Sequence, residues 1–559
     1  MTSPPSEPNA SRDASPTKAR ASRTPSPFRF PSGPVLTRAE FLRRAGALGV
    51  IVVGGAPLLA ACTSDGEPGE TGASGSVPTV PTDKLRARIN VDLKNADPGD
   101  VFDAPDGTAV SLAYENLVRF APDSKDLENW LAVEWEPSDD FLRWHFKLQE
   151  GVLFHGGYGE MTADDVKYSF ERIAGLVPGE DHSYQADWAA LKEVEVDGTY
   201  EGTVVLNETY APLMTTTVPF QVGSIVSKAA VADLGDEFRV HPIGTGPYEL
   251  VERIPKQKIV FRRFEDYWGD KPSWDEIELV IIPETSATEI ALETGELDYS
   301  AVGLKAAGRL SESGDFTVQQ HTTFDQIWVG MNMENPKLQD INVRQAIRYA
   351  IDVPGIITAA FEGDGERATA VVSSQMPIGF WEDAPLYEQD LDKAREYMAA
   401  AGVEGLELEI AIGSVQTYKI AAEIVQANLA EIGITVSINS DDSKFDLGPG
   451  LRELELFITV YYGAPDPIWS TQWFRCSQFD KWNWMYFCND EYDQLDRAAA
   501  RELDSEKRTE MYIREQELMD EAAVAVWLIW PTSTSVTRAG IQPSFEITNA
   551  PLLWNFKPV

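Results

Sequence analysis

The chain has 559 residues, of which 43% are hydrophobic, 24% are charged and only three are cysteines. This composition supports large cores, so it excludes a chain that is disordered throughout, a disulfide scaffold and a multi-zinc protein. The length indicates two to four folding units, and the net charge of −42 repels phosphate and disfavours nucleic-acid binding.

The first 61 residues are predicted to be a bacterial export signal. They carry eight basic and three acidic side chains, which leaves a charge of −47 on residues 62–559. A basic stretch is followed by an apolar run over 45–61 and then by small residues, which is the order of an export signal.

The apolar run ends with Leu59-Ala60-Ala61-Cys62, which resembles the lipobox of bacterial lipoproteins. The resemblance implies that Cys62 is acylated and becomes the first residue of the mature chain. A transmembrane anchor with an incidental cysteine is the alternative, although about 17 apolar residues are few for a span. Phe41-Leu42 follow Arg38 as in a twin-arginine signal, but Ala39 replaces the second arginine, so the export route stays open.

Residues 62–82 are rich in Gly, Ser, Pro and Thr, and they are predicted to be a flexible tether. Export also places the other two cysteines, Cys476 and Cys488, in an oxidising compartment, where a disulfide across the short intervening loop is expected. Two buried free thiols are the alternative.

The first half of the body contains a strand and a well-marked helix start. Residues 141–148 alternate partly between apolar and polar and are rich in aromatics, which predicts a strand. Thr162 and Asp165 form a capping-box pattern at the start of a helix. The buried face of that helix is predicted to carry Val166, Phe170 and Ile173.

The second half alternates between predicted helices and strands, which favours α/β layers. One helix should bury Val343, Ala346, Ile347, Ala350 and Ile351, and another should span 391–401 and stop at Gly402. Thr417 is predicted to cap a third helix, which buries Ile420, Ile424 and Ala427 and ends at Gly433. Strands are predicted over 434–438 and 524–530.

The motifs of common enzymes are missing from the sequence. None of the five histidines (His145, His155, His182, His241 and His321) has a second histidine four positions away, as a helical zinc pair requires. There is no Gly-x-Ser-x-Gly elbow and no phosphate loop, and Pro247 removes an amide donor from the segment Gly244-Thr245-Gly246-Pro247. The sequence therefore predicts no catalytic residue, no metal site and no cofactor.

Four segments together resemble the solute-binding lipoproteins of bacterial ABC importers, family 5, the peptide, nickel and opine class. The first joins Trp144–Phe154 and His155-Gly156-Gly157 to Met161-Thr162-Ala163-Asp164-Asp165-Val166. The second combines Gly244-Thr245-Gly246-Pro247-Tyr248 with Tyr267-Trp268-Gly269. The third and fourth are Gly295-Glu296-Leu297-Asp298 and the run Val343-Arg344-Gln345-Ala346-Ile347-Arg348-Tyr349-Ala350-Ile351-Asp352.

The resemblance implies an α/β, two-lobed clamshell like periplasmic binding proteins of class II, with an extra subdomain. Lobe 1 would contain residues 83–115, 241–320 and 520–559, and the extra subdomain would span 116–240. Lobe 2 would span 321–519. Arg344 and Arg348 are expected to be structural ion-pair partners rather than ligand contacts.

The family places specificity residues just before the segment between the two cysteines, which is 461–469 here. Asp466 lies between two prolines, and a stiff carboxylate beside aromatics would suit an ammonium ligand. A turn in which Asp466 satisfies backbone amides is the alternative. The predicted ligand-binding residues are Asp466, Trp469, Tyr462, Trp484, Phe324, Trp328 and Tyr114, the last paired with Glu115. Phe324 and Trp328 are expected to lie where the chain crosses between the lobes.

One departure from the peptide-binding members concerns the aspartate that binds the peptide amino terminus. It lies four positions before the motif proline, and this chain has Gly463 there. Peptides, opines, polyamine-like cations and sugars therefore stay open as ligands.

The resemblance implies a non-enzymatic receptor that delivers a small solute or peptide to ABC permease subunits. It would be a monomer, held at the outer face of the cell membrane by its lipid anchor. An extracytoplasmic hydrolase and a ligand-sensing lipoprotein without transport are the alternatives.

Overall fold

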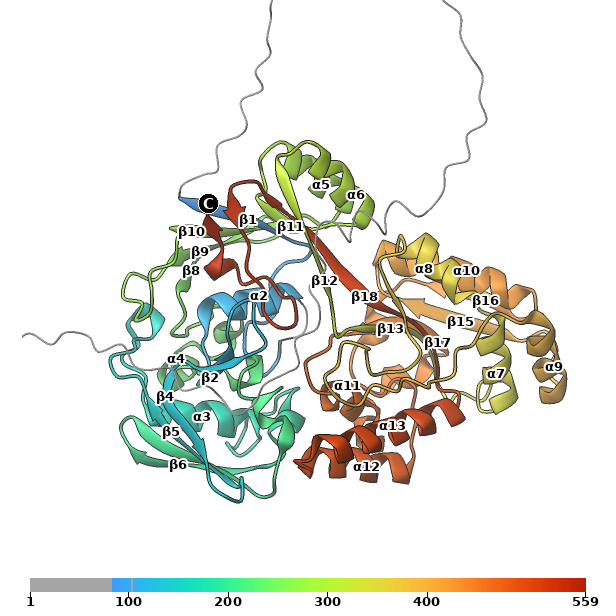
Figure 1. Ribbon diagram of the computed structural model, residues 1–559, viewed down its shortest axis with the longest axis horizontal. Helices are drawn as coiled ribbons and strands as arrows, with labels where there is room; N and C mark the ends of the chain where they lie inside the picture. The colour runs from blue at the N-terminus through green and yellow to red at the C-terminus, as the bar shows by residue number, and fades with distance from the viewer. Residues whose placement is uncertain (1–82, 102–103) are drawn as a thin grey trace, which may run out of the picture.

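The structure is a computed structural model that describes residues 83–101 and 104–559. The predicted export signal, Cys62 and the tether lie outside these described residues. Within the described part of the chain, no helix is both long and apolar enough to cross a membrane. The chain forms two lobes side by side, with the earlier residues mostly in one and the later residues mostly in the other (Figure 1).

One twelve-stranded mixed sheet runs through both lobes, with the path β16-β15-β17-β13-β18-β11-β1-β10-β9-β8. Lobe 1 holds β1 (Lys84–Ile89), β8 (Tyr248–Ile254), β9 (Lys258–Arg263), β10 (Glu276–Ile281) and β11 (Tyr299–Ala301). Lobe 2 holds β13 (Gln326–Met331), β15 (Glu407–Ile412), β16 (Thr435–Asn439) and β17 (Leu456–Tyr461). Two further strands, β12 (Phe316–Thr322) and β14 (Gly365–Arg367), pair with β18 off this path.

Strand β18 (Ala525–Arg538) joins the two lobes. Its first half pairs with β13 and β14, and its second half pairs with β12 and β11. The strand extends well beyond the predicted 524–530, because its second half is a run of Ser and Thr that no apolar pattern marks. Those residues nevertheless pair with β12 throughout, and Ser535–Thr537 also pair with β11, which satisfies backbone groups without an apolar pattern.

The helices of lobe 2 cover its half of the sheet and largely follow the predicted patterns. They are α7 (Ile341–Ala350), α8 (Val353–Ala360), α9 (Leu391–Ala401) and α10 (Gln416–Ala430). Helix α9 ends at Gly402 in the left-handed conformation, as predicted. Arg348 pairs with Asp520, whereas Arg344 donates to three backbone carbonyls, so both arginines are structural.

Helix α10 differs from its prediction. It begins at Gln416 after Val415 rather than with a Thr417 cap, and it buries Ala421, Ala422, Val425 and Leu429. The small alanines allow the helix to approach the sheet closely, so the buried stripe is displaced by one position from the larger isoleucines.

The extra subdomain contains an antiparallel sheet, β4-β5-β7-β6. The strands of this sheet are β4 (Ala132–Pro137), β5 (Arg143–Leu148), β6 (Leu191–Gly198) and β7 (Glu201–Leu206). The subdomain also contains a separate short hairpin of β2 (Val118–Phe120) and β3 (Leu127–Asn129). Its α-helices are α3 (Ala163–Ile173) and α4 (Lys228–Leu234). The predicted capping box is confirmed, because Thr162 caps α3 and its amide donates to Asp165 at 3.0 Å. Val166, Phe170 and Ile173 are buried as predicted.

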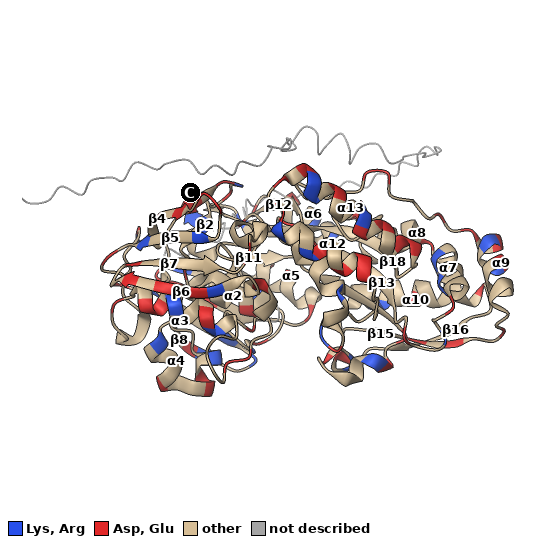
Figure 2. Ribbon diagram, turned by 90° about the horizontal axis from the view of Figure 1, so that it is seen from below, with Lys and Arg blue, Asp and Glu red and all other residues tan. Residues whose placement is uncertain are grey.

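The remaining elements complete the two lobes. In lobe 1 these are α2 (Ala104–Ala113), α5 (Thr285–Glu293) and α6 (Leu304–Glu312), with β19 (Ile541–Gln542) and β20 (Lys557–Pro558) near the end of the chain. Lobe 2 adds α11 (Ile468–Thr471), α12 (Asp490–Arg501) and α13 (Ser505–Glu521). Acidic and basic residues are interspersed along α13 (Figure 2), and two of them, Arg508 and Glu515, are buried. The predicted disulfide between Cys476 and Cys488 is present just before α12.

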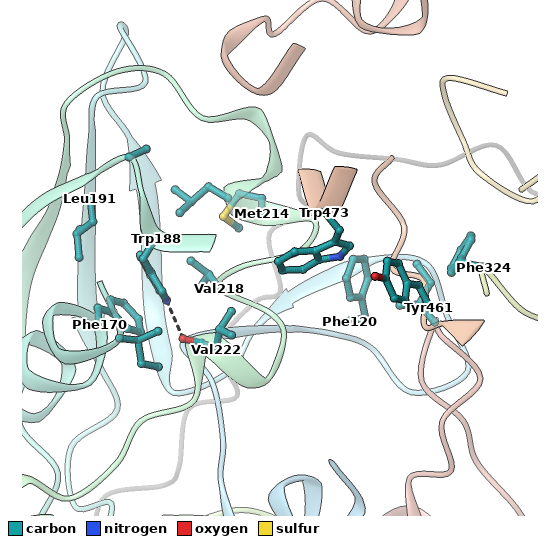
Figure 3. Packing of buried hydrophobic residues seen from close by; sticks show 14 of the residues in the cluster. Phe120, Phe170, Trp188, Leu191, Met214, Val218, Val222, Phe324, Tyr461 and Trp473 are labelled. Carbon is teal, nitrogen blue, oxygen red and sulfur yellow. Dashed lines mark hydrogen bonds between the residues drawn. The ribbon is translucent and has the colours of Figure 1, made fainter. Parts of the chain in front are cut away.

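The largest hydrophobic cluster passes from the subdomain into lobe 2. It connects Phe170 and Trp188 beneath the subdomain sheet with Trp473, Tyr461 and Phe324 on the other lobe (Figure 3). Apolar packing therefore continues across the boundary between the lobes.

The side chain of Glu115 connects two sequence motifs of lobe 1, the glycine-rich segment at 244–248 and the aromatic segment at 267–269. Its buried carboxylate accepts hydrogen bonds from Trp130 Nε1 (2.6 Å), Tyr267 Oη (2.8 Å), Trp268 Nε1 (2.9 Å) and Thr245 Oγ1 (2.9 Å). Burial raises the pKa of Glu115, and the four donors oppose that shift. Glu115 is thus a structural node rather than a ligand contact.

Candidate ligand-binding site

Two neighbouring pockets occupy the cleft between the lobes. The first has a volume of about 550 Å³ and the second about 510 Å³. Both are lined by Asn90, Tyr184, Tyr462 and Trp469, so they are two compartments of one cleft. Tyr184 of the subdomain stacks on Trp469 of lobe 2 with ring centroids 6.0 Å apart, and this ring pair lies where the two compartments meet.

Four of the predicted ligand-binding residues line this cleft. Tyr462 and Trp469 face both compartments, Trp484 lines the first, and Tyr114 lines the second. Tyr462 is 55% exposed, so its ring is accessible to a solute. Contact of these residues with a solute stays a prediction.

Phe324 and Trp328 do not line either compartment. Trp328 is fully buried and packs edge to face on Tyr461, with ring centroids 4.7 Å apart, and Phe324 is buried in the same cluster. The segment does cross between the lobes as expected. Its aromatic side chains, however, point into the core because β13 is covered on both faces, which corrects the prediction of ligand contact.

Asp466 is also placed differently from the prediction. It is 2% exposed, and its carboxylate pairs with Arg508 Nη2 at 2.7 Å and accepts from Thr215 Oγ1 at 3.0 Å. Its charge is already neutralised, and neither compartment is lined by it. The alternative prediction, a turn in which Asp466 satisfies backbone amides, agrees better with the structure, since Asp466 also accepts a hydrogen bond from the Ile468 amide.

Asp325 is a cleft carboxylate that the prediction missed. It precedes β13, lines the second compartment, and accepts a hydrogen bond from the Gly463 amide at 2.8 Å. No Lys, Arg or His of the described residues forms an ion pair with it. Burial raises the pKa of Asp325 to about 6. A signal was present, because Asp325 follows Phe324 in the segment expected to cross between the lobes.

Gly463 cannot carry the aspartate that peptide-binding relatives would have at its position. A Cβ atom there would lie 2.2 Å from the Phe324 carbonyl oxygen and 2.3 Å from the Phe324 Cβ. The close approach of the two strands therefore requires glycine, and it places the Asp325 carboxylate against the Gly463 backbone.

The second compartment contains two other charged groups. Arg88 donates to the carbonyls of Ile282 (2.8 Å) and Pro283 (3.1 Å) rather than to a carboxylate. Glu546 accepts from Thr548 at 2.8 Å, and burial raises its pKa. The compartment thus presents carboxylates and a guanidinium to one small volume, as a zwitterionic or amine-bearing solute would need.

One buried and one exposed polar contact hold the subdomain against lobe 2 beside the cleft. Gln472 Nε2 donates to Asp187 Oδ1 at 3.3 Å, and Glu208 pairs with Arg501 Nε at 2.7 Å. Asp187 is fully buried and its second oxygen has no partner among the described residues. Burial raises the pKa of Asp187 to about 7, while Gln472 and Arg475 oppose the shift.

The Asp187→Asn variant is expected to be more stable than the parent, and increasingly so as the pH rises. The folded state holds more protons at residue 187 than the unfolded state between about pH 4 and 7, so ionisation destabilises the parent as pH rises. Urea unfolding should show the gain in the free energy of unfolding to be about 2 kcal/mol larger at pH 8 than at pH 5.5. Equal gains at the two pH values would contradict this.

Asp97, Asp100 and His182 also lie together, with potential ligand atoms within 4.8 Å of one another. Arg172 pairs with Asp97, and both ring nitrogens of His182 face carboxylates, those of Asp100 and Glu180. Burial by itself would lower the pKa of His182, but that pKa is raised because the imidazole donates a hydrogen bond to the Asp100 carboxylate and lies near negative charges. Arg172 and His182 already pair with these acids, so the cluster is a polar network between the segment after β1 and the subdomain.

Comparison with known proteins places the whole body in one class. The family described as bacterial extracellular solute-binding proteins, family 5, middle region, matches residues 126–484. The dipeptide-binding protein of Escherichia coli K12 is 27% identical over 473 residues, which cover 78% of this chain and 87% of that protein.

Solved structures agree with this comparison. The periplasmic binding protein DppA of Helicobacter pylori, in complex with the peptide STSA, has a TM-score of 0.79 and 26% identity, and the match covers 85% of this chain and 98% of that chain. The protein MoaA of A. tumefaciens R10, in complex with mannopinic acid, has a TM-score of 0.78 and 25% identity, with 86% and 100% covered. Both the two-lobed α/β fold and the family inferred from the sequence motifs are confirmed. The chain belongs to the family 5 bacterial extracellular solute-binding proteins.

Proposed function

We propose that this protein is an extracytoplasmic receptor that closes its two lobes around a small amine-bearing solute and delivers it to an ABC importer. The relatives named above bind a dipeptide, a peptide or an opine, and an opine and a peptide share a charged, amino-acid-like core. Acylation of Cys62 would keep the receptor at the membrane, and the tether at 62–82 would let the body rotate.

The observation that carries the proposal is Asp325. A half-buried carboxylate without a positive partner in the described chain is costly, and a bound ammonium group would remove that cost. One Asp325 oxygen accepts from Gly463, and a carboxylate has further acceptor positions for a ligand. Asp325 therefore takes the role that the sequence assigned to Asp466.

Two alternative functions were left open by the sequence, an extracytoplasmic hydrolase and a lipoprotein that senses a ligand without transporting it. Membership in a family of binding proteins disfavours an extracytoplasmic hydrolase. A receptor that only signals would share this cleft, and neighbouring permease and ATPase genes would distinguish transport from signalling.

The Asp325→Asn variant tests the proposal because asparagine keeps the shape and the acceptor for Gly463 but removes the charge. Native mass spectrometry of the purified protein should first identify a co-purifying amine. Calorimetry with that amine should then show affinity reduced about 30-fold or more in Asp325→Asn. Affinity in the parent should rise with pH up to about 6, where Asp325 becomes ionised, and then level off.

Glu404→Gln is the matched control, since it removes one exposed negative charge away from the cleft. It should change affinity by less than about twofold. Unchanged affinity in Asp325→Asn would remove Asp325 from the site.

A further inference from the structure

The first compartment of the cleft is an aromatic chamber. Nine of its lining residues are Tyr, Trp or Phe, and we define the chamber walls as Tyr461, Trp469, Trp473 and Trp484. Tyr461, Trp473 and Trp484 also belong to the main hydrophobic cluster, so their rings are held in place by the core. Such walls lose little freedom when a ligand enters.

The rings meet nearly at right angles, as adjacent walls of a box do. Tyr461 and Trp484 are 5.8 Å apart at 82°, and Trp469 and Trp473 are 6.1 Å apart at 86°. A small group inside such a box meets ring surfaces on several sides. Aromatic faces carry the negative part of the ring quadrupole, which attracts cations.

The polar edges of these walls are used by the protein itself. Trp469 Nε1 donates to the Tyr462 carbonyl at 2.9 Å, and Trp484 Nε1 donates to the Lys481 carbonyl at 2.7 Å. The Tyr461 hydroxyl donates to the Trp482 carbonyl. These three walls therefore offer carbon surface rather than hydrogen bonds, which favours a group that needs no hydrogen-bond partner.

Charges around the chamber favour a positive occupant. Asp442 and Asp446 line it from the segment between β16 and β17, and Lys94 of lobe 1 lines it from the opposite side. In the described chain, every Lys or Arg stacked on an aromatic ring lies over a ring other than the four walls. The walls are thus not occupied by a described cation of the protein.

We propose that the aromatic chamber binds an alkylated ammonium group of the solute, such as trimethylammonium. A quaternary ammonium carries charge but no N–H, so it matches ring faces whose polar edges are already bonded. This inference rests on the proposed function: the solute would carry two ammonium groups, a primary one at Asp325 and an alkylated one in the chamber. The shared residues Tyr184 and Trp469 make the two compartments continuous, so one extended molecule can occupy both.

Nε-trimethyl-lysine is a suitable probe because it carries both groups on one short chain. Its neutral isostere, 2-amino-7,7-dimethyloctanoic acid, has the same shape with carbon in place of the quaternary nitrogen. Calorimetry on the purified protein should show trimethyl-lysine binding about tenfold more tightly than the isostere. Equal affinities would overturn the proposal and indicate a simple apolar pocket, and so would the absence of binding by trimethyl-lysine.

Substitutions at Trp484 and at Asp325 test which compartment binds which ammonium group. Trp484→Leu should weaken trimethyl-lysine about tenfold and change the isostere by less than threefold, and Trp484→Phe should lie between parent and Trp484→Leu. A Trp484→Leu variant that weakens both probes equally would contradict the chamber. Asp325→Asn should weaken both probes equally, because both have the primary amine. If it weakens neither while their tenfold difference persists, the amine site is wrong and the chamber stands.

Discussion

Replacing Asp466 with alanine is expected to lower the free energy of unfolding by about 3–5 kcal/mol, because the buried Arg508 guanidinium would lose its carboxylate partner. The pair is 2.7 Å long and both side chains are almost fully buried. Thr215 on the subdomain would also lose its acceptor. Urea unfolding followed by intrinsic fluorescence measures the change.

Two controls separate charge burial from other effects of the Asp466 substitution. The double variant Asp466→Ala, Arg508→Met removes both charges and should recover part of the loss. Asp392→Ala breaks an exposed pair with Arg395 and should cost less than about 1 kcal/mol. An Asp466→Ala protein as stable as the parent would contradict this account and would restore the sequence-based expectation that Asp466 is free for a ligand.

Replacing Glu115 with alanine is expected to cost about 4 kcal/mol or more. Four donors from three segments, on Trp130, Thr245, Tyr267 and Trp268, would be left without their acceptor in a buried site. Each orphaned donor costs about 1–3 kcal/mol, although the site can relax in part. Chemical denaturation of the variant, or its failure to accumulate in folded form, reports the loss.

Graded variants test whether the node acts through its hydrogen bonds. Glu115→Gln keeps one acceptor oxygen, so it should lose less than Glu115→Ala. Tyr267→Phe removes a single donor and should cost about 1 kcal/mol. If Glu115→Ala costs no more than Tyr267→Phe, the carboxylate does not hold these segments together.

Local sequence was sufficient for features that depend on neighbours along the chain. The capping box at Thr162, the end of α9 at Gly402 and the buried face of α3 follow from the spacing of a few residues. The disulfide between Cys476 and Cys488 is likewise a short-range feature. Long motifs, through their resemblance to a family, gave the two-lobed fold.

The position of the site's charges depended on contacts that are distant in sequence. Asp466 meets Arg508 and Thr215, which are 42 and 251 positions away, so its stiff local backbone could not reveal that its charge is neutralised. Asp325 and Gly463 are 138 positions apart and come together because β13 pairs with β17. Of the predicted aromatic residues, Tyr462, Trp469 and Trp484 line the cleft, whereas Trp328 does not, because β13 buries that side chain.

The sequence by itself determined the export signal's pattern, the local helix and strand signals, and the absence of common catalytic motifs. The tertiary structure decided which carboxylate faces the cleft with its charge free, because partners in folded space, not neighbours in the chain, neutralise a charge. It also decided which aromatic rings line the cleft, since the same residue types serve equally well in a core and in a binding wall.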